Sequence, residues 1–398
     1  MPWPLASPAA GRLSYSMLRI GFDIRPALLN YAGIGRYVRE LATAITRLPE
    51  SEQTYLECFA PSWRGGRQTP PGLEEGRYNM NLGWLPGRVM DRLNKIPGLD
   101  AGHYPAKVDV FHWTDYTYPH VRSAATVMTL HDAAFVAEPT FHGWDTSVLL
   151  KRVRAALLQA DRVIVVSEVG RFDAELLGGE SDRVRVVPHG VSPYFKPPQE
   201  GQSNGLLAPG ADGDYLLTIG TLEPRKNYMR ILRAMESCWD KDLAPDWVIV
   251  GRPGWDYEKF MTAVHTSRHR ARIRVVNSVT DTELLRFYQG AMAHIFPSLH
   301  EGFGLVVLEA MACGTPSVVG DKTAPAWVAG PSGLRVDPKN VDSIAEGIER
   351  IVGDDAWRRQ ARAVGLQRAR KFTWGAAAKQ TVEVYREAMA ARQQRVGV

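Results

Sequence analysis

The stretch HIFPSLHEGFGLVVLEAMACGTPSVV, residues 294–319, carries the pattern that decides the fold. The apolar run 294–298 predicts a strand, a glycine-rich turn opens a predicted helix, and a second apolar run, 316–320, follows. Gly314 stands between helix and strand, where a C-cap needs a left-handed backbone. A strand, a helix and a further strand at this spacing form the repeating unit of a parallel sheet covered by helices.

The same alternation of apolar runs and helical patterns extends over the rest of the chain. Helical patterns occupy 34–48 and 146–160, for example. Because such units bury both faces of a parallel sheet, the pattern predicts an α/β fold. Strands are predicted at 18–24, 54–60, 108–113, 126–130, 162–167, 184–188, 215–220, 247–251, 273–277, 294–298 and 316–320.

The spacing of these runs divides the chain into two domains. At about 150 residues per domain, a chain of 398 residues allows two or three. Residues 196–213 are rich in proline, glycine and polar groups, which is typical of a linker. We therefore predict two doubly wound, Rossmann-like domains that face each other across a cleft, where ligands of such sheets bind. The predicted parts are an N-terminal domain, 17–195, a C-terminal domain, 214–372, a last helix, 373–392, that crosses back to the first domain, and a disordered extension, 1–16.

Composition and charge exclude several classes of protein. With 45% hydrophobic and 23% charged residues, the chain is neither disordered nor fibrous. The 48 lysines and arginines exceed the 43 acidic residues by a formal charge of +5. This excess fits an anionic ligand such as a phosphate ester and is too small to indicate nucleic-acid binding.

Cysteine usage and hydropathy favour a cytoplasmic protein. The three cysteines form no CxxC pair, which suits a reducing compartment. The N-terminal stretch lacks the pattern of a signal peptide, and no apolar run approaches the ~20 residues that span a bilayer. We expect a cytoplasmic location, with peripheral contact at the inner face of the cell membrane as an option.

Two glutamates flank the start of the helix predicted after residue 304. Glu301 precedes the helix and Glu309 lies about a turn and a half inside it, so the two cannot form one acid pair. We expect them to contact different hydroxyl groups of an elongated, sugar-bearing ligand. Its phosphates would lie at the helix start, where free N–H groups and the dipole favour anions. The alternative, a solvated Glu301 and an incidental Glu309, fits a glutamate within an apolar helix less well.

A pair of cations follows the first strand of the second domain. The segment TIGTLEPRKN, 218–227, ends a strand and turns into a helix, and it carries Arg225 and Lys226. Together these side chains could neutralise a diphosphate as leaving-group charge develops. The alternative is a solvated surface pair, and the place at the carboxyl end of a strand favours the phosphate role.

The segment EGFGLVVLEAMACGTP, 301–316, resembles the donor-site signature of the family 4 retaining glycosyltransferases of GT-B fold. The sequence of residues 218–227 is similar to that of mannosyltransferase-like members of this family. The resemblance to the family extends from residue 18 to about residue 392. It implies that Glu309 holds the ribose of a nucleotide sugar and that Glu301 contacts the transferred sugar. It further implies that the backbone amides of Gly302, Phe303, Gly304 and Leu305 contact the sugar and the diphosphate. Thr221, also expected at the donor, stands where wider relatives carry an arginine, and Val279 and Thr280 lie in the region that would recognise the base.

The N-terminal half resembles the same family in two segments. The loop NYAGIGRY, 30–37, is similar to the family's GGIGRY segment, which implies that Gly33 and Gly35 approach the donor phosphate. A dinucleotide fingerprint is the alternative, but the loop lies about nine residues past its strand and no acidic ribose ligand follows the second strand. His131 matches a family histidine that contacts the donor sugar. Three further polar residues at strand ends are expected to bind acceptor: Asp132, His112 and Asp115.

A basic amphipathic stretch, 84–97, offers a second contact surface. Its apolar side chains alternate with arginines and a lysine, a pattern that can lie on an anionic membrane. A helix that packs on the first domain explains the pattern equally well. If the acceptor is lipid-linked, membrane contact is expected here.

The resemblance implies a metal-independent hexosyltransferase without a cofactor. A hexosyl unit, mannose by subgroup, would pass from a nucleoside diphosphate sugar, GDP-linked by preference, to a glycan or lipid-linked saccharide in cell-surface polysaccharide assembly. The acceptor would attack from the face of the departing diphosphate, which accepts the proton, and His131, Glu301, Arg225 and Lys226 would form the catalytic set. The segment TAPAWV, 323–328, departs from the family at Trp327, which leaves the sugar open.

Three other functions stay open at this point. One is another GT-B enzyme, such as a sugar-nucleotide epimerase or a phosphorylase. Another is a non-catalytic protein that binds nucleotide sugars, although four charged site residues exceed what binding needs. The last is nucleic-acid binding through the basic C-terminal stretch, which the small net charge disfavours.

Overall fold

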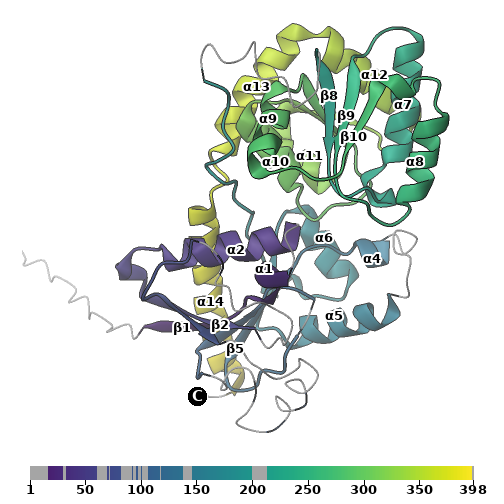
Figure 1. The fold of residues 1–398 in the computed structure, drawn as a ribbon. Helices are drawn as coiled ribbons and strands as arrows, with labels where there is room; N and C mark the ends of the chain where they lie inside the picture. Colours follow the sequence, from purple (N-terminus) through teal and green to yellow (C-terminus); the bar gives the residue numbers. More distant parts are fainter. Residues whose placement is uncertain are drawn as a thin grey trace, which may run out of the picture.

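The computed structural model describes residues 17–29, 33–60, 70, 72–81, 92, 96, 100, 106–116, 118–137, 146–199 and 213–396. The predicted extension 1–16, most of the linker 196–213 and all but two residues of the stretch 84–97 lie outside the described residues. Within the described parts, the chain forms two α/β units, one above the other in Figure 1.

The first unit is built on a seven-stranded parallel sheet. Its order is β3-β2-β1-β4-β5-β6-β7, so the chain winds outward in both directions from β1 and β4. This doubly wound topology confirms the predicted α/β fold of the first half. Its strands are β1 (Leu18–Asp23), β2 (Thr54–Phe59), β3 (Tyr78–Asn81), β4 (Val110–Trp113), β5 (Ala125–Leu130), β6 (Arg162–Val165) and β7 (Val184–Val186).

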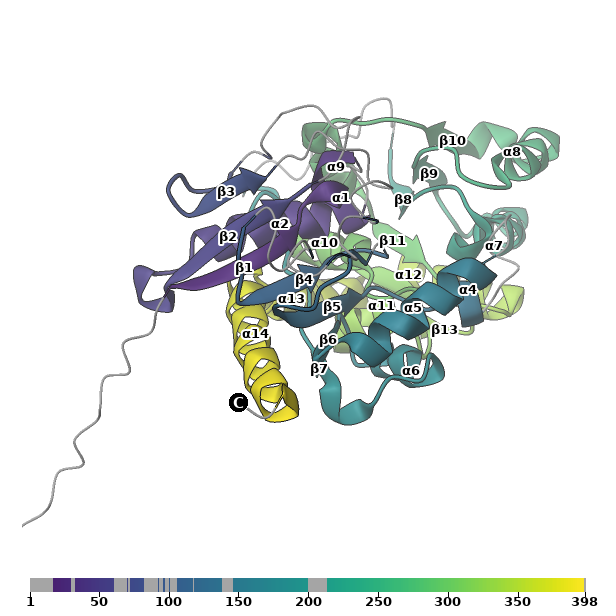
Figure 2. The same ribbon diagram turned by 90° about the horizontal axis from the view of Figure 1, so that it is seen from below.

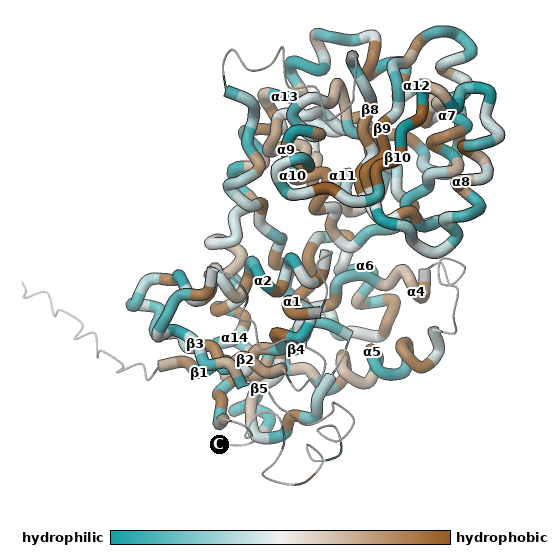
Figure 3. Tube along the Cα trace, viewed as in Figure 1, coloured by the Kyte–Doolittle hydropathy of each residue, from teal (hydrophilic) through white to brown (hydrophobic). Residues whose placement is uncertain are grey.

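The second unit repeats the arrangement with six parallel strands, in the order β10-β9-β8-β11-β12-β13. Figure 3 shows hydrophobic segments along β8 and β9, as expected for strands that are covered on both faces. The strands are β8 (Tyr215–Ile219), β9 (Asp246–Val250), β10 (Ile273–Val276), β11 (Ala293–Phe296), β12 (Ser317–Gly320) and β13 (Gly333–Val336).

Two edge strands were not predicted. The β3 segment YNMN is half-buried and lacks an apolar run, and the β13 segment GLRV is only four residues long. An edge strand needs less apolar surface than a central strand, so its sequence signal is weaker.

Helices connect most of the successive strands and cover both faces of each sheet. The long helices agree with the predicted patterns to within one or two residues at most ends. Their bounds are α1 (Arg25–Leu29), α2 (Gly33–Thr46), α4 (Ala134–Ala137), α5 (Ser147–Gln159), α6 (Val169–Leu176), α7 (Tyr228–Asp240), α8 (Tyr257–Thr266), α9 (Asp281–Gly290), α10 (Leu305–Cys313), α11 (Ala324–Ala329), α12 (Val341–Gly353), α13 (Asp355–Ala369) and α14 (Trp374–Val396). No helix among the described residues is both long enough and apolar enough to cross a membrane.

The last helix, α14, leaves the second unit and packs on the first (Figures 1 and 2). Ala378, Val382 and Tyr385 are buried in the same apolar cluster as Ile20 of β1 and Val110 of β4. With α2, α14 covers one face of the first sheet, while α5 and α6 cover the other. The final helix therefore belongs to the core of the first unit, although the second unit precedes it in the chain.

Candidate active site

The turn before α10 brings the backbone of the second unit against the first. Gly304, the N-cap of α10, has a φ of +100°, which glycine adopts without steric cost. Gly302 lies against His131, and a Cβ built on Gly302 would stand 1.6 Å from the His131 carbonyl oxygen. Ser167 Oγ donates a 2.7 Å hydrogen bond to the carbonyl of Gly302. The two units can meet at this point only because residue 302 has no side chain.

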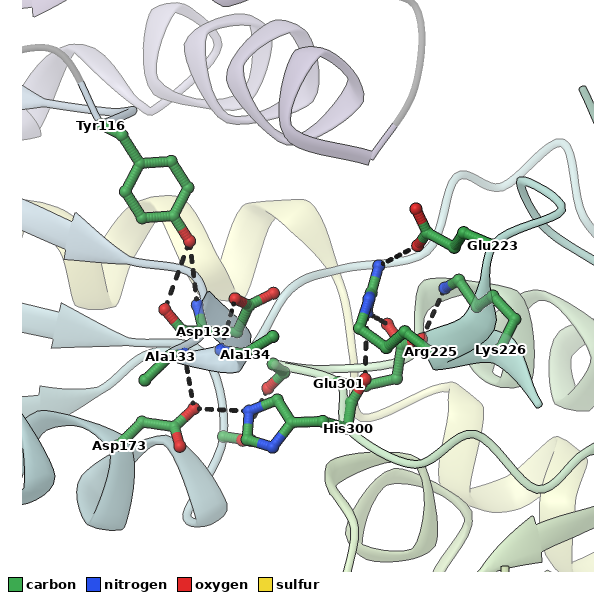
Figure 4. Close-up of polar contacts among 12 residues, drawn as sticks. Tyr116, Asp132, Ala133, Ala134, Asp173, Glu223, Arg225, Lys226, His300 and Glu301 are labelled. Atoms are coloured by element: carbon green, nitrogen blue, oxygen red, sulfur yellow. Dashed lines mark hydrogen bonds and ion pairs between the residues drawn. The ribbon is translucent and has the colours of Figure 1, made fainter. Parts of the chain in front are cut away.

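Glu301 is held by two cations of its own unit (Figure 4). Its Oε2 lies 2.8 Å from Nη1 of Arg225, and its Oε1 lies 2.5 Å from Nζ of Lys226. The Arg225 guanidinium also donates to the carbonyl of His300 at 3.0 Å and to Glu223 Oε1 at 2.7 Å. We expected both cations at the lip of the cleft, where they would face a diphosphate. In the structure both are largely buried and bind Glu301.

The electrostatics of this cluster keep Glu301 ionised. Burial alone would raise the pKa of Glu301, but the charges of Arg225 and Lys226 outweigh that effect and lower it. Burial also lowers the pKa of Lys226, more than the attraction of Glu301 raises it. An ionised carboxylate has about four acceptor positions, so Glu301 can hold both cations and still accept a hydrogen bond from a sugar hydroxyl.

His131 lies directly after β5, at the carboxyl edge of the first sheet. Burial lowers its pKa, so the imidazole is neutral near pH 7. Its Nε2 lies 2.9 Å from the carbonyl oxygen of Thr114, which can only accept, so Nε2 carries the hydrogen. Nδ1 therefore carries the lone pair and can accept a hydrogen bond from a hydroxyl group.

A second polar contact joins the loop before α10 to helix α6 of the first unit (Figure 4). His300 Nε2 lies 3.2 Å from Asp173 Oδ2, which also accepts a 3.0 Å hydrogen bond from the backbone of Ala133. Burial alone would lower the pKa of His300, but the hydrogen bond and charge of Asp173 outweigh it and raise the pKa. Tyr116, in the loop after β4, contacts the backbone of Asp132 in the loop after β5. These contacts fix the loop after β5 against the loop before α10.

Glu309 lies in the middle of α10 and contacts both units. Its Oε1 forms an ion pair with Arg36 of α2, and its Oε2 accepts a 2.8 Å hydrogen bond from the hydroxyl of Tyr288. A cavity of about 80 Å³ lies beside this pair. It is lined by Arg36, Glu40, Gly190, Val191, Ser192, Tyr194, Phe195, Asp281, Leu305, Glu309 and Trp374.

The prediction that His112 binds acceptor is wrong. His112 is fully buried, with Nδ1 2.7 Å from the hydroxyl of Tyr385 and Nε2 2.8 Å from Thr129 Oγ1. Burial lowers its pKa to about 3. Side chains alternate between the faces of a strand, and position 112 faces the side that α14 covers. That cover comes from the far end of the chain, so the strand pattern could not reveal it.

The other two predicted acceptor residues lie at strand ends. Asp132, after β5, is half-buried, and its Oδ1 accepts a 3.1 Å hydrogen bond from the backbone of Ala134 at the start of α4. Asp115, after β4, accepts a 2.6 Å hydrogen bond from the backbone of Tyr116. Both are thus near the junction, and their contact with an acceptor stays a prediction.

The predicted donor-binding residues of the first unit and of the helix start differ in their exposure. Gly33 is exposed at the first position of α2, Gly35 is buried, and residues 30–32 before them lie outside the described residues. Leu305 begins α10 and lines the cavity. The ring of Phe303 is buried, so only its backbone could contact a ligand.

The region predicted to recognise the base begins α9. Thr280 is the N-cap: its hydroxyl accepts a 3.2 Å hydrogen bond from the amide of Glu283, whose carboxylate in turn binds Thr280. This capping box occupies the Thr280 side chain. Val279 is half-buried against the second core, and Thr221 is half-buried after β8. Base recognition at these positions stays a prediction.

Sequence reasoning missed several residues of the junction. Arg36 directly follows Gly35 in the loop NYAGIGRY, 30–37, and His300 directly precedes Glu301. Their position beside a motif was therefore the one sequence signal that could have indicated them. Asp173 and Ser167 carried no such signal, because only folding brings them to the second unit. Among the described residues, no group of three or more His, Cys, Asp or Glu is placed to hold a metal ion.

Comparison with known proteins agrees with this geometry. The family model of the group 1 glycosyl transferases matches residues 207–388, and that of Glycosyltransferase Family 4 matches residues 31–194. The O-antigen chain mannosyltransferase B of Escherichia coli is 31% identical over 93% of this chain and 100% of its own length. A D-inositol 3-phosphate glycosyltransferase of Kineococcus radiotolerans is 30% identical over 92% of each chain.

Solved structures show the same fold. The sucrose-phosphate synthase of Thermosynechococcus elongatus superposes with a TM-score of 0.72 at 22% identity, over 94% of this chain and 100% of its own. Anabaena HepE, solved in complex with UDP and glucose, gives a TM-score of 0.66 at 16% identity, over 92% and 98%. The two parallel sheets and the glycine turn before α10 are consistent with the fold of these solved structures. With the family models and the relatives, they show that the chain belongs to the family 4 glycosyltransferases of GT-B fold.

Proposed function

We propose that the protein is a retaining hexosyltransferase that moves a mannose-type sugar from a GDP-linked donor to a saccharide acceptor. The observation that carries this proposal is the cluster of Glu301, Arg225 and Lys226 at the start of α10, opposite the neutral His131. The sugar and the cell-surface setting are supported by the mannosyltransferase name of the Escherichia coli relative.

In the proposed reaction, the diphosphate lies at the start of α10. The first backbone N–H groups of a helix have no partner within it, and the helix dipole adds favourable charge for an anion. Arg225 and Lys226 would exchange part of their contact with Glu301 for the leaving phosphate as its negative charge grows. The bound diphosphate thus replaces an interaction that the free cluster already contains.

The sugar would lie between the two units. The Nδ1 atom of His131 and the free acceptor positions of Glu301 would each receive a hydrogen bond from a sugar hydroxyl. The acceptor oxygen would bond to the anomeric carbon on the face from which the phosphate leaves. The bond between that carbon and the phosphate oxygen breaks, and the phosphate takes the acceptor proton, so the configuration at the carbon is retained.

The acceptor would be a glycan or a lipid-linked saccharide. It would enter on the side of the first unit, near Asp132 and Asp115, which lie at the carboxyl ends of β5 and β4. No metal ion or cofactor is assigned a role in this proposal, because cationic side chains and the helix start would stabilise the leaving group.

A donor panel tests the proposal. The purified protein is mixed with GDP- and UDP-linked hexoses and with a synthetic lipid-linked saccharide, and the product is identified by mass and by the NMR signature of its anomeric carbon. We expect transfer from GDP-mannose with retained configuration. Donor consumption that yields only a free epimer would support the epimerase alternative. A shift in melting temperature with nucleotide but no transfer to any acceptor of the panel would favour a binding protein.

A further inference from the structure

The ion pair between Arg36 and Glu309 joins the two units. The residues are 273 positions apart: Arg36 lies in the first turns of α2, and Glu309 lies in α10 of the second unit. The Glu309 side chain is only 4% exposed, whereas the Arg36 side chain is 28% exposed. A buried carboxylate of one unit is therefore reached by a cation that the other unit supplies.

Arg36 is fixed by further contacts at the same junction. Its guanidinium lies 5.8 Å from the ring centre of Phe195, which belongs to the connection between the units. Its Nη2 lies 4.0 Å from Oδ1 of Asp281 at the start of α9. Cation–π stacking and charge attraction limit the orientations of the guanidinium. Its position thus depends on how the first unit, the connection and the second unit are arranged.

Glu309 has acceptor capacity left beside these contacts. An ionised carboxylate offers about four acceptor positions. Arg36 uses one oxygen and the hydroxyl of Tyr288 uses the other, so each oxygen can accept one more hydrogen bond. Glu309 also lines the cavity of about 80 Å³. Two adjacent hydroxyl groups are the chemical feature that matches two remaining acceptor positions on one carboxylate.

The surroundings of Glu309 act on its charge. Burial raises the pKa of Glu309, the charge of Arg36 opposes this, and the hydrogen bond from Tyr288 opposes it further. The other titratable groups at this place are Asp281 of α9, Glu40 of α2 and Cys313 of α10 itself. The charge of Arg36 is the strongest influence that lowers the pKa of Glu309, so its removal would raise that pKa further.

We infer that Arg36 is a positioning residue of the donor site: through its ion pair, the acceptor-side unit holds the Glu309 carboxylate for two adjacent ribose hydroxyls of the nucleotide. This inference rests on the proposed function, since it requires a nucleotide donor. It makes nucleotide affinity depend on the approach of the two units. Arg36 itself need not touch the donor.

The experiment measures the coupling between Arg36 and the ribose hydroxyls by calorimetry. Wild type and Arg36→Met are titrated with GDP, with UDP, and with the 2′,3′-dideoxy form of whichever binds. We expect Arg36→Met to weaken the ribonucleotide about tenfold and to change the affinity for the dideoxy form less than twofold. A merely structural role would weaken both ligands equally.

Further variants make the result unambiguous. Arg36→Lys keeps the charge and should recover part of the affinity, which guards against a folding defect of Arg36→Met. Arg47→Met, at an exposed arginine just after α2, is the matched control and should bind like wild type. As pH is lowered, affinity for the ribonucleotide should also begin to fall at a higher pH in Arg36→Met than in wild type, because the raised pKa of Glu309 lets it become protonated sooner.

The outcomes separate the inference from the proposed function. If Glu309→Gln weakens the ribonucleotide but Arg36→Met leaves it unchanged or tighter, Arg36 is not a positioning residue, and a tighter complex would mean that it competes with the nucleotide. Equal weakening of both ligands by Arg36→Met overturns the inference as well. If wild type binds neither GDP nor UDP, both the donor site and the inference are rejected.

Discussion

The start and the middle of α10 both contact the first unit, but by different physical means. At the start, the negative charge of Glu301 is balanced by two cations of its own unit. The contact across the junction there is a close approach of the Gly302 backbone to His131. In the middle, Glu309 depends on Arg36 of the other unit for its counter-charge.

The difference separates two tasks at one helix. The cluster around Glu301 exists whether or not the units approach each other, because all three charged groups belong to the second unit. The pairing of Glu309 exists only when the units meet. We therefore expect the start of α10 to determine the rate of transfer and its middle to link donor affinity to domain closure.

The largest loss of transfer is expected from a substitution that breaks the contact between the units at the helix start. In Gly302→Ala, the new Cβ would meet backbone atoms of His131, which cannot move aside as a flexible side chain could. The units would then be held apart, and transfer should fall by at least about 10²-fold. Rates of transfer with saturating donor measure the effect.

Its matched control is Gly353→Ala, at the end of α12, where an added Cβ meets no atom within 4 Å. This variant should transfer at the wild-type rate. If Gly302→Ala is also active, the observed approach of the two units is not the reactive arrangement.

The second largest loss of transfer is also expected at the start of α10. Lys226→Ala removes one of the two cations from Glu301 and from the proposed diphosphate site. Transfer should fall about 10²-fold because less leaving-group charge is stabilised, while Arg225 keeps the Glu301 loop in place. Steady-state kinetics with the preferred donor measure this effect. The control is Lys241→Ala, which removes an exposed lysine that pairs with Glu349 and should leave transfer unchanged. Unchanged kcat would remove Lys226 from the catalytic set.

The smallest effect concerns the polar contact beside Gly302. The pKa of His300 is raised by Asp173, so its charged form stabilises the folded protein below about pH 6.5, and this stability is lost as pH rises through the raised pKa. The melting temperature of His300→Gln should therefore fall below that of wild type at pH 5.5 and approach it at pH 8.5. A difference that is the same at both values would show that the Asp173 contact contributes no pH-dependent stability.

The sequence predicted features whose partners lie close in the chain. The caps of α10, with Gly304 and Gly314 both in left-handed conformations, follow from one contiguous motif. The sequence also placed Arg225 and Lys226 after the first strand of the same unit as Glu301, and in the structure they lie in the turn between β8 and α7. Their actual contact with Glu301 was missed, since burial makes the charges pair with each other.

The sequence alone determined the α/β class, the two units and the family, since hydrophobic period and a local motif encode them. Only the tertiary structure decided the fate of the polar residues near strand ends. His112 and His131 both end or follow strands, yet α14 buries the first in the core while the second faces the glycine turn. Arg36 and Glu309 meet across 273 residues. Such partners depend on how the two units pack, and no local pattern records that packing.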